Sequence, residues 1–383
     1  MQELYIINGR VLTESGFSDV NLLIKEEKIA QFVEKGAIPE GAQCYDAKGR
    51  YLVPGFIDVH THGAVNVDVN AATADDLEKI SHYFATQGTT AWLCSILTDS
   101  KEQTLWCINQ YKEHKNMDSN GAELIGIHLE GPFLAAEYKG AMPEHLLREA
   151  DLELLKEYQE AAEGDIRYLT VSPEVAGVAD NIQNMVELGM VVSVGHSGAD
   201  YDTAMKCIHN GANASTHTFN AMKLMHQHYP AISGAVLESE VYCEAICDGR
   251  HLHPGMVRLL LKTKGLDKVV AVSDSIMATG LPDGNYKLGV NDVTVTDGDA
   301  RLTVGGTRAG STLTTGKALK NLIEFTGRPL EDIIALLTKN PAKMLGIYEE
   351  RGSIDLNKLA DLVILDENYE IVDTYVKGKL IQK

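Results

Sequence analysis

The sequence predicts an α/β protein made of a large TIM-type (β/α)8 barrel and a small β-sandwich domain that both termini form together. Two observations favour this fold class. In the middle of the chain, short apolar segments of β-forming residues alternate with longer segments of helical periodicity, as in a parallel sheet that helices cover on its faces. Near both ends, short β segments are separated by turn residues. The length of 383 residues is enough for one barrel and a further small domain.

Eight β segments in the middle of the chain account for the barrel. They are Leu52–Val59, Thr89–Ile96, Leu124–Leu129, Tyr168–Val171, Val191–Val194, Ala212–Thr216, Tyr242–Ile246 and Lys268–Val272. Intervening stretches such as Thr73–Gln87, Asn181–Leu188 and Asp202–His209 carry apolar residues at helical spacing. Eight such units match a (β/α)8 barrel in count and length. A doubly wound open sheet is the alternative, but the Gly-rich nucleotide-binding turn that often follows its first strand is missing.

The short β segments near the two ends predict the second domain. They are Leu4–Leu12, Asn21–Ile24, Ile29–Phe32, Leu362–Leu365, Glu370–Val376 and Lys379–Ile381. Neither end is long enough to build much of a core alone. We therefore expect residues 1–53 and 348–383 to form one β-sandwich domain, with the barrel of residues 54–347 inserted between them.

Composition and charge exclude several classes of protein. With 34 Lys and Arg against 54 Asp and Glu, the net charge of −20 disfavours nucleic acid as a partner, because such binding requires a field that neutralises phosphates. No apolar run approaches the length of a membrane span, and the chain does not open with a basic segment, so we expect neither a membrane protein nor a secreted one. Six cysteines without a CxxC motif indicate a reduced, cytoplasmic protein.

Imidazole and carboxylate groups follow six of the eight predicted strands. Active sites of such barrels lie at the C-terminal ends of the strands, so these groups are expected to converge on one mouth. The six segments are Asp58-Val59-His60-Thr61-His62-Gly63, His128-Leu129-Glu130-Gly131-Pro132, Gly195-His196-Ser197, Thr216-His217-Thr218-Phe219-Asn220, Cys247-Asp248-Gly249-Arg250-His251-Leu252-His253 and Ser273-Asp274-Ser275. This set of donors predicts a site for one or two divalent transition-metal ions, with zinc or iron as the expected metal.

The spacing of His60 and His62 supports a metal site. Residues i and i+2 of a strand share a face, so both rings can point at one ion. Two histidines at this spacing also arise by chance, but the other strand-end groups lie at matching depths, which favours the metal. No cysteine has a comparable position, and Cys243 and Cys247 are expected to be buried thiols in or next to a strand.

A metal held by histidines and a glutamate, beside an aspartate, indicates hydrolysis. The ion lowers the pKa of a water molecule and polarises a substrate carbonyl. Asp274 is expected to act as the general base and then as the general acid, and His251 to contact the developing oxyanion. Amide or amidine hydrolysis fits this set, whereas redox chemistry does not, because no flavin or nicotinamide fingerprint is present.

The Gly-rich run at residues 305–312 invites interpretation as a phosphate-binding loop. It does not match the Walker pattern, because no lysine follows Gly310 and the later Lys317 lies too far along the chain. We expect it instead to be a loop that folds over the mouth of the barrel.

The motifs together resemble those of a known family. Pro54-Gly55-Phe56-Ile57-Asp58-Val59-His60-Thr61-His62-Gly63 looks like the first-strand signature of the amidohydrolase superfamily. More specifically, the chain resembles the N-acetylglucosamine-6-phosphate deacetylases through His128-Leu129-Glu130-Gly131-Pro132-Phe133, Gly195-His196-Ser197, Thr216-His217-Thr218-Phe219-Asn220-Ala221-Met222, Asp248-Gly249-Arg250-His251, Val272-Ser273-Asp274-Ser275, Gly280-Leu281-Pro282-Asp283-Gly284 and Ala309-Gly310-Ser311-Thr312-Leu313-Thr314. These motifs run in family order across nearly the whole chain.

The resemblance implies a metal-dependent deacetylation that releases acetate and an amino sugar phosphate. It also implies a role for individual residues. Glu130, His196 and His217 would bind the principal metal, His60 and His62 a second ion bridged through Glu130, Asp274 would be the catalytic acid and base, His251 would contact the substrate, and the backbone around Asn220 and Ala221 its phosphate. The family further implies a homodimer whose subunits complete each other's sites.

Two departures from the family pattern fall in the region expected to read the substrate. The loop after the sixth strand reads His226-Gln227-His228-Tyr229-Pro230, so His228 stands where the family has an arginine for the sugar phosphate. The family's KGAH segment appears as Lys139-Gly140-Ala141-Met142, in which Ala141 is an expected substrate contact and Met142 replaces a histidine. Arginine offers a permanently charged bidentate fork, which histidine does not. Lys139, Lys223 and Arg308 are the alternatives for the missing charge.

Several functions therefore stay open at this stage. The substrate could be N-acetylglucosamine-6-phosphate, N-acetylgalactosamine-6-phosphate or an unphosphorylated N-acetyl sugar. A cyclic amidase or a deaminase of the same superfamily is the rival enzyme, but the fourth strand ends in Val171-Ser172-Pro173-Glu174, without the lysine that bridges two metals in dihydroorotase-like cyclic amidases. A non-catalytic metal-binding barrel is disfavoured by Asp274, because pure binding needs no such carboxylate.

Overall fold

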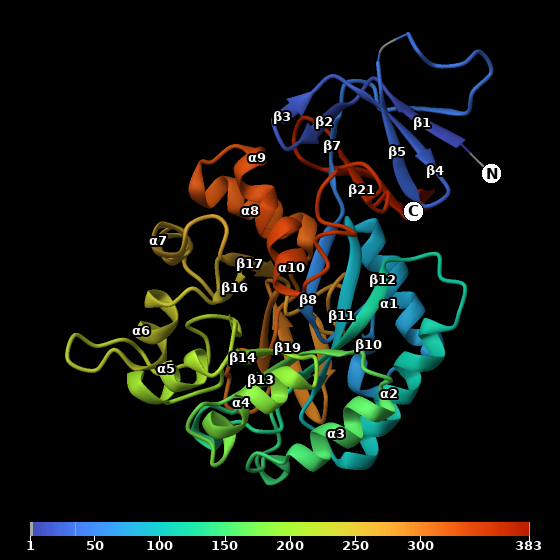
Figure 1. Ribbon diagram of the computed structural model, residues 1–383. Coiled ribbons are helices and arrows are strands. Elements are labelled where there is room, and N and C mark those ends of the chain that lie inside the picture. Colours follow the sequence, from blue (N-terminus) through green and yellow to red (C-terminus); the bar gives the residue numbers. More distant parts are fainter. Residues whose placement is uncertain (1–2, 35, 383) are drawn as a thin grey trace.

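The computed structural model describes residues 3–34 and 36–382, which form a large barrel with a smaller β structure at one end (Figure 1). Both chain ends lie in the smaller part. Strand β7 (Tyr51–Pro54) belongs to the smaller part and leads directly into the first barrel strand, β8 (Phe56–Thr61). The small β structure therefore adjoins the N-terminal end of β8, whereas the predicted site residues follow the C-terminal ends of the strands.

Among the described residues, eight parallel strands form the barrel sheet, in the order β17-β16-β15-β14-β13-β12-β11-β8. The remaining bounds are β11 Thr89–Leu97, β12 Glu123–Glu130, β13 Ile166–Val171, β14 Val191–Val194, β15 Ala214–Ser215, β16 Tyr242–Ile246 and β17 Val269–Val272. Thr61 and Ser275 form a parallel bridge just beyond β8 and β17, which brings the first and last strands together. The predicted barrel and its strand order along the chain are confirmed.

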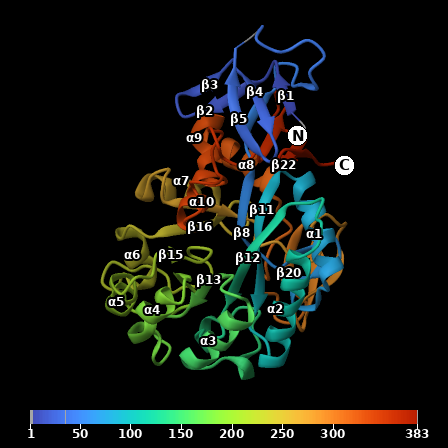
Figure 2. The same cartoon turned by 45° about the vertical axis from the view of Figure 1, so that its right-hand side comes forward.

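Helices surround the barrel strands (Figure 2). Their bounds are α1 Ala74–Thr86, α2 Lys101–Lys115, α3 Leu152–Ala161, α4 Val178–Glu187, α5 Tyr201–His209, α6 Ala231–Glu238, α7 Pro254–Lys264, α8 Thr315–Thr326, α9 Leu330–Ile333 and α10 Lys339–Met344, with short 3-10 turns at Val69–Ala71, Ala136–Tyr138, Glu144–Leu146 and Ile334–Leu336. Helix α1 shows why these segments begin where they do: Thr73 and Asp76 form a reciprocal capping box that satisfies the first backbone N–H groups.

The first predicted strand, Leu52–Val59, is two strands in the structure. Gly55 separates β7 from β8, and its backbone N–H donates to the Asp361 carbonyl oxygen at 2.9 Å. A Cβ atom at Gly55 would lie 2.1 Å from Thr90 Oγ1, so only glycine allows β8 to approach β11 this closely. The chain therefore passes from one sheet to another within a single apolar run, which the sequence pattern cannot reveal.

The terminal strands form two sheets that pack on a common core. One has the order β5-β4-β1-β6 and the other β23-β22-β21-β7-β2-β3. The bounds are β1 Glu3–Ile7, β2 Arg10–Thr13, β3 Gly16–Ser18, β4 Asn21–Lys25, β5 Lys28–Val33, β6 Cys44–Asp46, β21 Leu362–Leu365, β22 Ile371–Val376 and β23 Lys379–Leu380. Leu22 and Ile24 of one sheet and Leu362 and Ile364 of the other belong to one buried cluster. The exact domain limits, 1–53 with 348–383 and 54–347, stay a prediction.

Two further small sheets lie beside the barrel mouth. Strands β9 (Gly63–Ala64) and β10 (Val67–Asp68) pair directly after β8. Strands β18 (Gly284–Leu288), β19 (Asn291–Thr296) and β20 (Asp299–Leu302) form an antiparallel sheet after the eighth barrel strand, in a segment for which the sequence predicted no element. This three-stranded sheet carries the Gly-rich run that follows it.

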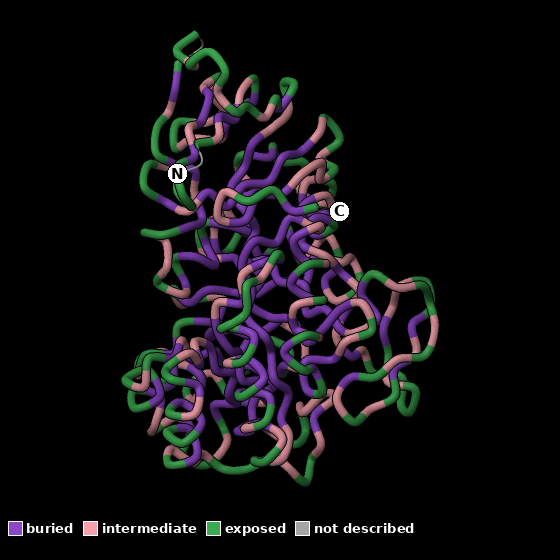
Figure 3. The backbone as a smooth tube through the Cα atoms, turned by 90° about the vertical axis from the view of Figure 1, so that its right-hand side faces the viewer, coloured by how far each residue is buried: buried purple, intermediate pink, exposed green. Residues whose placement is uncertain are grey.

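Burial follows the barrel closely. The backbone of the central strands is buried, whereas exposed residues gather on the outer connections (Figure 3). Strand β11, for example, is buried at every position, as expected for a parallel strand covered on both faces. Within residues 3–34 and 36–382, none of the helices combines the length and the apolar character needed to cross a membrane.

Candidate active site

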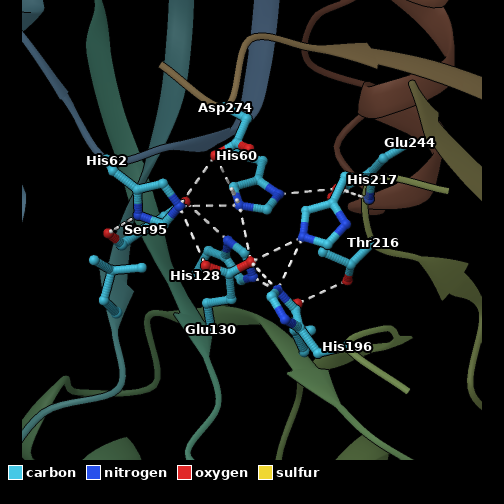
Figure 4. A network of polar contacts seen from close by, with 12 residues as sticks. His60, His62, Ser95, His128, Glu130, His196, Thr216, His217, Glu244 and Asp274 are labelled. Atoms are coloured by element: carbon cyan, nitrogen blue, oxygen red, sulfur yellow. Dashed lines mark hydrogen bonds and ion pairs between the residues drawn. The ribbon is translucent and has the colours of Figure 1, made fainter. Parts of the chain in front are cut away.

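Six of the predicted site residues meet at the C-terminal mouth of the barrel as two adjoining groups (Figure 4). One group contains His60, His62 and Asp274, and the other contains Glu130, His196 and His217. Within each group the ligand atoms lie within 4.8 Å of one another, and all six residues are buried. The structure therefore brings together every residue that the sequence predicted as a metal ligand, together with the predicted catalytic aspartate.

The Glu130 carboxylate joins the two groups. Its Oε1 atom lies 3.1 Å from His196 Nε2 and 3.3 Å from His217 Nε2, whereas its Oε2 atom lies 3.3 Å from His62 Nε2. Glu130 is the last residue of β12, at the centre of the mouth. Because Oε1 also lies 3.4 Å from His60 Nε2, this carboxylate contacts both groups and can serve as a ligand shared between them.

The closure of the barrel assembles the first group. The Asp274 N–H donates to the His60 carbonyl oxygen at 2.9 Å, and the His62 N–H donates to the Ser275 carbonyl oxygen at 2.7 Å. As a result, Asp274 Oδ1 lies 3.3 Å from His62 Nε2 and 3.6 Å from His60 Nε2. Residues more than two hundred positions apart in the sequence are held together by backbone pairing, so their side chains need little further ordering.

Three of the six residues have a left-handed backbone. The φ angles are 47° at His196, 27° at His217 and 49° at Asp274. This region is unfavourable for residues with a Cβ atom, and each such residue costs on the order of 1–3 kcal/mol. The turn it produces at the end of a strand directs each side chain over the mouth of the barrel, and the surrounding hydrogen bonds sustain it.

A buried carboxylate beneath the site, Glu244 of β16, orients two of the ligands. Its Oε2 atom lies 2.9 Å from His60 Nδ1 and accepts the His217 backbone N–H at 2.8 Å. These contacts fix the His60 ring with Nδ1 towards Glu244 and with Nε2 towards Glu130 and Asp274, which lie 3.4 Å and 3.6 Å away. Sequence reasoning missed Glu244, since it considered only residues that follow a strand.

A further buried histidine, His128 of β12, lies under the site. His128 Nδ1 contacts Ser95 Oγ and its Nε2 contacts Thr170 Oγ1, both at 2.8 Å. Burial and the neighbouring His60 hold the pKa of His128 well below its usual value, so the ring is neutral. His128 packs edge-on against the His60 ring at 4.6 Å between centroids and so supports its position.

The electrostatics of the site attract cations. Burial alone would lower the pKa of His62, but its hydrogen bonds to Asp274 and Glu130 raise it to about 9. Burial would raise the pKa of Asp274, but His60 and His62 outweigh it and hold that pKa below the usual value. The Glu130 carboxyl also has a pKa well below its usual range, because the surrounding histidines outweigh its burial. Both carboxylates are therefore ionised.

The donor set fits one or two divalent ions. Four imidazole rings direct Nε2 atoms towards two carboxylates, and His60 Nε2 and His62 Nε2 lie only 3.1 Å apart. His196 Nε2 and His217 Nε2 are equally close, at 3.0 Å. Both close nitrogen pairs lie beside the Glu130 carboxylate, and histidine with carboxylate is a ligand combination typical of zinc and iron.

A cavity of about 410 Å³ opens above the two groups. Its walls include four of the predicted substrate contacts, Ala141, Asn220, Ala221 and His251. The Asp248 carboxylate accepts the His251 backbone N–H and lies 2.7 Å from His251 Nδ1, which fixes the ring. The predicted contact His228 is different: it is exposed and does not line this cavity.

The three alternatives for the missing positive charge occupy different places. Lys139 Nζ donates to the Met142 carbonyl oxygen at 3.0 Å, and Lys223 is exposed; neither residue lines the cavity. Arg308 does line it, together with Arg301, which the sequence did not single out. Met142, where the family has a histidine, is buried against a small apolar cluster and also reaches the cavity wall.

The backbone of the Gly-rich run at residues 305–312 holds Asp274 in place. The Ser311 N–H donates to the Asp274 carbonyl oxygen at 2.7 Å, and the Ile276 N–H donates to the Ser311 carbonyl oxygen at 3.0 Å. Ser311 Oγ also donates to the Ser273 carbonyl oxygen at 2.6 Å. These contacts extend the barrel edge by one short parallel pairing and fix the end of β17.

Comparisons with known proteins agree with this geometry. The chain matches the amidohydrolase family over residues 51–381. It is 32% identical to the N-acetylglucosamine-6-phosphate deacetylase of Bacillus subtilis (strain 168), with 99% of this chain and 96% of that protein covered. It is 30% identical to the N-acetylgalactosamine-6-phosphate deacetylase of Escherichia coli O157:H7, with 97% of each covered.

Solved structures agree as well. The fold matches a mutant N-acetyl-D-glucosamine-6-phosphate deacetylase from Mycobacterium smegmatis, in complex with N-acetyl-D-glucosamine-6-phosphate, at a TM-score of 0.93 and 29% identity, with 100% of both chains covered. The family match spans most of this chain, and the sequence similarity extends over nearly its full length. The protein therefore belongs to the amidohydrolase superfamily and, within it, to the N-acetylglucosamine-6-phosphate deacetylase family.

Proposed function

We propose that this protein hydrolyses the N-acetyl group of an amino sugar 6-phosphate, with N-acetylglucosamine-6-phosphate as the first candidate, giving acetate and the amino sugar phosphate. The observation that carries the proposal is the Glu130 carboxylate between the two groups, with the ionised Asp274 beside it under an open cavity. The similarity to deacetylases of such substrates along nearly the whole chain supports it.

The proposed metal site uses the residues of the two groups. Glu130, His196 and His217 hold the principal ion, and His60 and His62 provide for a second ion through the shared Glu130. We infer zinc or iron from the histidine and carboxylate donors. A bound ion supplies Lewis acidity towards the acetyl carbonyl and lowers the pKa of the attacking water.

The remaining chemistry belongs to the chain's own side chains. Asp274 accepts the proton of the attacking water at its carboxylate and then delivers it to the amine nitrogen as the C–N bond breaks. His251 donates from Nε2 to the carbonyl oxygen, and the Asp248 carboxylate, 2.7 Å from Nδ1, holds the ring in the orientation that this contact requires. Asn220, Ala221 and Ala141 position the sugar phosphate along the cavity wall.

A substrate panel tests the function directly. Purified protein is incubated with N-acetylglucosamine, N-acetylgalactosamine and the 6-phosphate of each, and released acetate and free amine are measured. We expect release from at least one phosphorylated sugar, with equal amounts of acetate and amine. N-acetylgalactosamine-6-phosphate is the second candidate, because the Escherichia coli relative carries that name. Release of ammonia or opening of a cyclic amide, without acetate from any N-acetyl sugar, would indicate a different amidohydrolase.

Removal of the metal provides the second test. Metal content is measured for the purified protein, for protein treated with a chelator, and after addition of zinc or iron. We expect one to two ions per chain, loss of acetate release on chelation and recovery on addition of the ion. A protein that holds no transition metal yet deacetylates the sugar would contradict the proposed site.

We also propose a cytoplasmic homodimer. The segment between β15 and α6 is highly exposed and apolar at its tip: Leu224, Met225 and Tyr229 are 76%, 57% and 73% exposed. Exposed apolar clusters of this kind often form contacts between subunits, and His228 lies within the same segment. Light scattering after gel filtration should give twice the mass of the chain, and Leu224→Glu should weaken the dimer. A monomer at micromolar concentration would rule this out.

A further inference from the structure

We propose that Arg308, assisted by Arg301, binds the phosphate group of the substrate at the mouth of the barrel. The assignment rests on the deacetylase function proposed above and adds the groups that make the enzyme prefer a phosphorylated sugar. The phosphate contact that the sequence suggested for position 228 is thereby assigned to Arg301 in β20 and to Arg308 in the segment that follows β20.

Both arginines face the cavity from the same small sheet. Arg301 lies in β20, and Arg308 pairs with it through an isolated antiparallel bridge. Residues directly opposite each other in an antiparallel pair project from the same face, so the two guanidinium groups lie side by side. Both line the cavity that also contains His251 and Asp274, and the hydrogen bond to Asp299, with a smaller contribution from the Asp248 carboxylate next to His251, raises the pKa of Arg308.

The two guanidinium groups share a single carboxylate. Arg301 Nε lies 2.8 Å from Asp299 Oδ2, and Arg308 Nε lies 2.8 Å from Asp299 Oδ1. The two guanidinium groups thus carry two positive charges against the one carboxylate that they contact, while the Asp248 carboxylate, which also acts on Arg308, lies 2.7 Å from His251 Nδ1. Asp299 therefore holds the forks in place without neutralising them, in a protein whose net charge is −20.

Each fork keeps one terminal nitrogen for a ligand. Arg308 uses Nε and Nη2 towards Asp299, and Arg301 uses Nε for Asp299 and Nη1 for the Gly306 carbonyl oxygen at 3.0 Å. Within the described residues, this leaves Nη1 of Arg308 and Nη2 of Arg301 available. Fixed guanidinium groups with free N–H donors are well suited to phosphate oxygens.

Other cations do not compete for this role within one chain. Among the described residues that line the cavity, Arg301 and Arg308 are the arginines, and no lysine occurs. The acidic groups on the same wall are Glu137 and, at the metal groups, Glu130 and Asp274. The side of the cavity next to Asp299 is thus its positive side, and the two metal groups form its floor.

The test compares a phosphorylated with an unphosphorylated substrate. We measure kcat and KM for N-acetylglucosamine-6-phosphate and N-acetylglucosamine with the wild type, Arg308→Leu, Arg308→Lys and Arg301→Leu. Lys287→Leu is the matched control. It removes one positive charge from the same sheet, but Lys287 pairs with Asp292 and does not line the cavity. The affinity for glucosamine 6-phosphate, measured by calorimetry, gives a readout that does not depend on turnover.

For Arg308→Leu we expect KM for the phosphorylated sugar to rise about 10- to 100-fold, the range expected for losing a hydrogen bond to a charged group. The kcat value should change little, and the kinetics with N-acetylglucosamine should stay the same. Arg308→Lys should recover part of the loss, since it restores charge but no fork. Arg301→Leu should have a smaller effect in the same direction, and Lys287→Leu should have none.

Two failures are distinguishable. If the wild type releases acetate from none of the four sugars of the substrate panel, the proposed function is wrong; if it acts only on the galactosamine compounds, the same variants are compared on N-acetylgalactosamine-6-phosphate and N-acetylgalactosamine. If acetate is released but Arg308→Leu lowers kcat/KM for both sugars equally, or leaves the affinity for glucosamine 6-phosphate unchanged, the phosphate assignment is wrong and the deacetylase function stands.

Discussion

At the scale of single residues, Asp274 has the clearest chemical role. Its carboxylate is ionised, buried and 3.3 Å from His62 Nε2 at the floor of the cavity. In Asp274→Asn the amide keeps the shape but cannot accept and return a proton, so kcat should fall about 10²- to 10⁴-fold. Acetate release measures the loss, and Asp292→Asn, an exposed residue of β19, is the control. Wild-type turnover by Asp274→Asn would contradict the acid and base role.

Glu244 is a positioning residue, and its substitution should act through the metal. In Glu244→Gln the group between His60 Nδ1 and the His217 N–H becomes an amide, whose NH2 end can only donate, so the His60 ring is held less firmly. Loss of such a partner typically lowers metal affinity about 10- to 100-fold. The affinity is measured by competition with a chromophoric chelator, independently of turnover. Unchanged metal affinity together with reduced folding stability would mean that Glu244 has only a structural role.

The residues at strand ends could be predicted, whereas those beneath them could not. His60, Glu130 and Asp274 follow apolar runs, so their place at the mouth follows from the barrel itself. Glu244 lies inside the apolar strand Tyr242–Ile246, where a charged residue is unusual, and that anomaly is the signal that could have revealed it. The role of Arg301 depends on a turn geometry that no local pattern encodes.

At the scale of elements, the segment after β20 links the substrate side of the cavity to the catalytic aspartate. Gly310 has a φ of 58°, and a Cβ atom there would lie 2.4 Å from Ile276 Cγ2 and 2.9 Å from the Asp274 carbonyl oxygen. Gly310→Ala should therefore displace Asp274 and lower kcat at least about tenfold. In addition, the positive φ of an alanine at this position should cost on the order of 1–3 kcal/mol of folding stability.

Gly305→Ala is the matched control for this segment. Gly305 also has a positive φ, of 87°, but nothing lies within 4 Å of a Cβ atom at that position. Both variants carry the backbone strain of a positive φ, but Gly310→Ala should lower the unfolding temperature further because of its steric overlap, and only Gly310→Ala should lose turnover. Equal kcat values for both variants would show that Asp274 does not depend on this packing.

The strands of the barrel were predictable, but the three-stranded sheet beside it was not. Parallel strands buried on both faces give continuous apolar runs, such as Val269–Val272. Strand β18, Gly284–Leu288, instead alternates partly buried and exposed positions and includes glycine, asparagine and lysine. This pattern is close to that of a loop, and only pairing with β19 and β20 distinguishes it.

At the scale of the whole molecule, an ion cluster built around the buried pair of Arg351 and Asp361 joins the barrel to the small β structure. Arg351 is 4% exposed and contacts the Glu123 carboxylate at the start of β12 and Asp361 at 3.4 Å, while Lys377 Nζ lies 2.7 Å from Glu123. Arg351→Met would leave Asp361 buried without its partner. We expect the free energy of unfolding to fall by about 3–5 kcal/mol, the usual result of breaking a buried pair.

The exposed pair of Arg328 and Asp332 provides the comparison. Both side chains are solvent-accessible and lie one helical turn apart, so Arg328→Met should cost no more than about 1 kcal/mol. Urea denaturation followed by fluorescence measures both variants. A loss for Arg351→Met no larger than that for Arg328→Met would mean that the cluster contributes little to holding the two parts together.

The shared core of the terminal sheets also constrains the order in which the chain can mature during synthesis. Leu22 and Ile24 leave the ribosome long before Leu362 and Ile364, with which they pack in one cluster. Domains generally fold as the chain emerges, so the barrel strands can associate while β4 still lacks its partners. The side chains of β4 can therefore be buried only after the barrel between the two sheets has been synthesised.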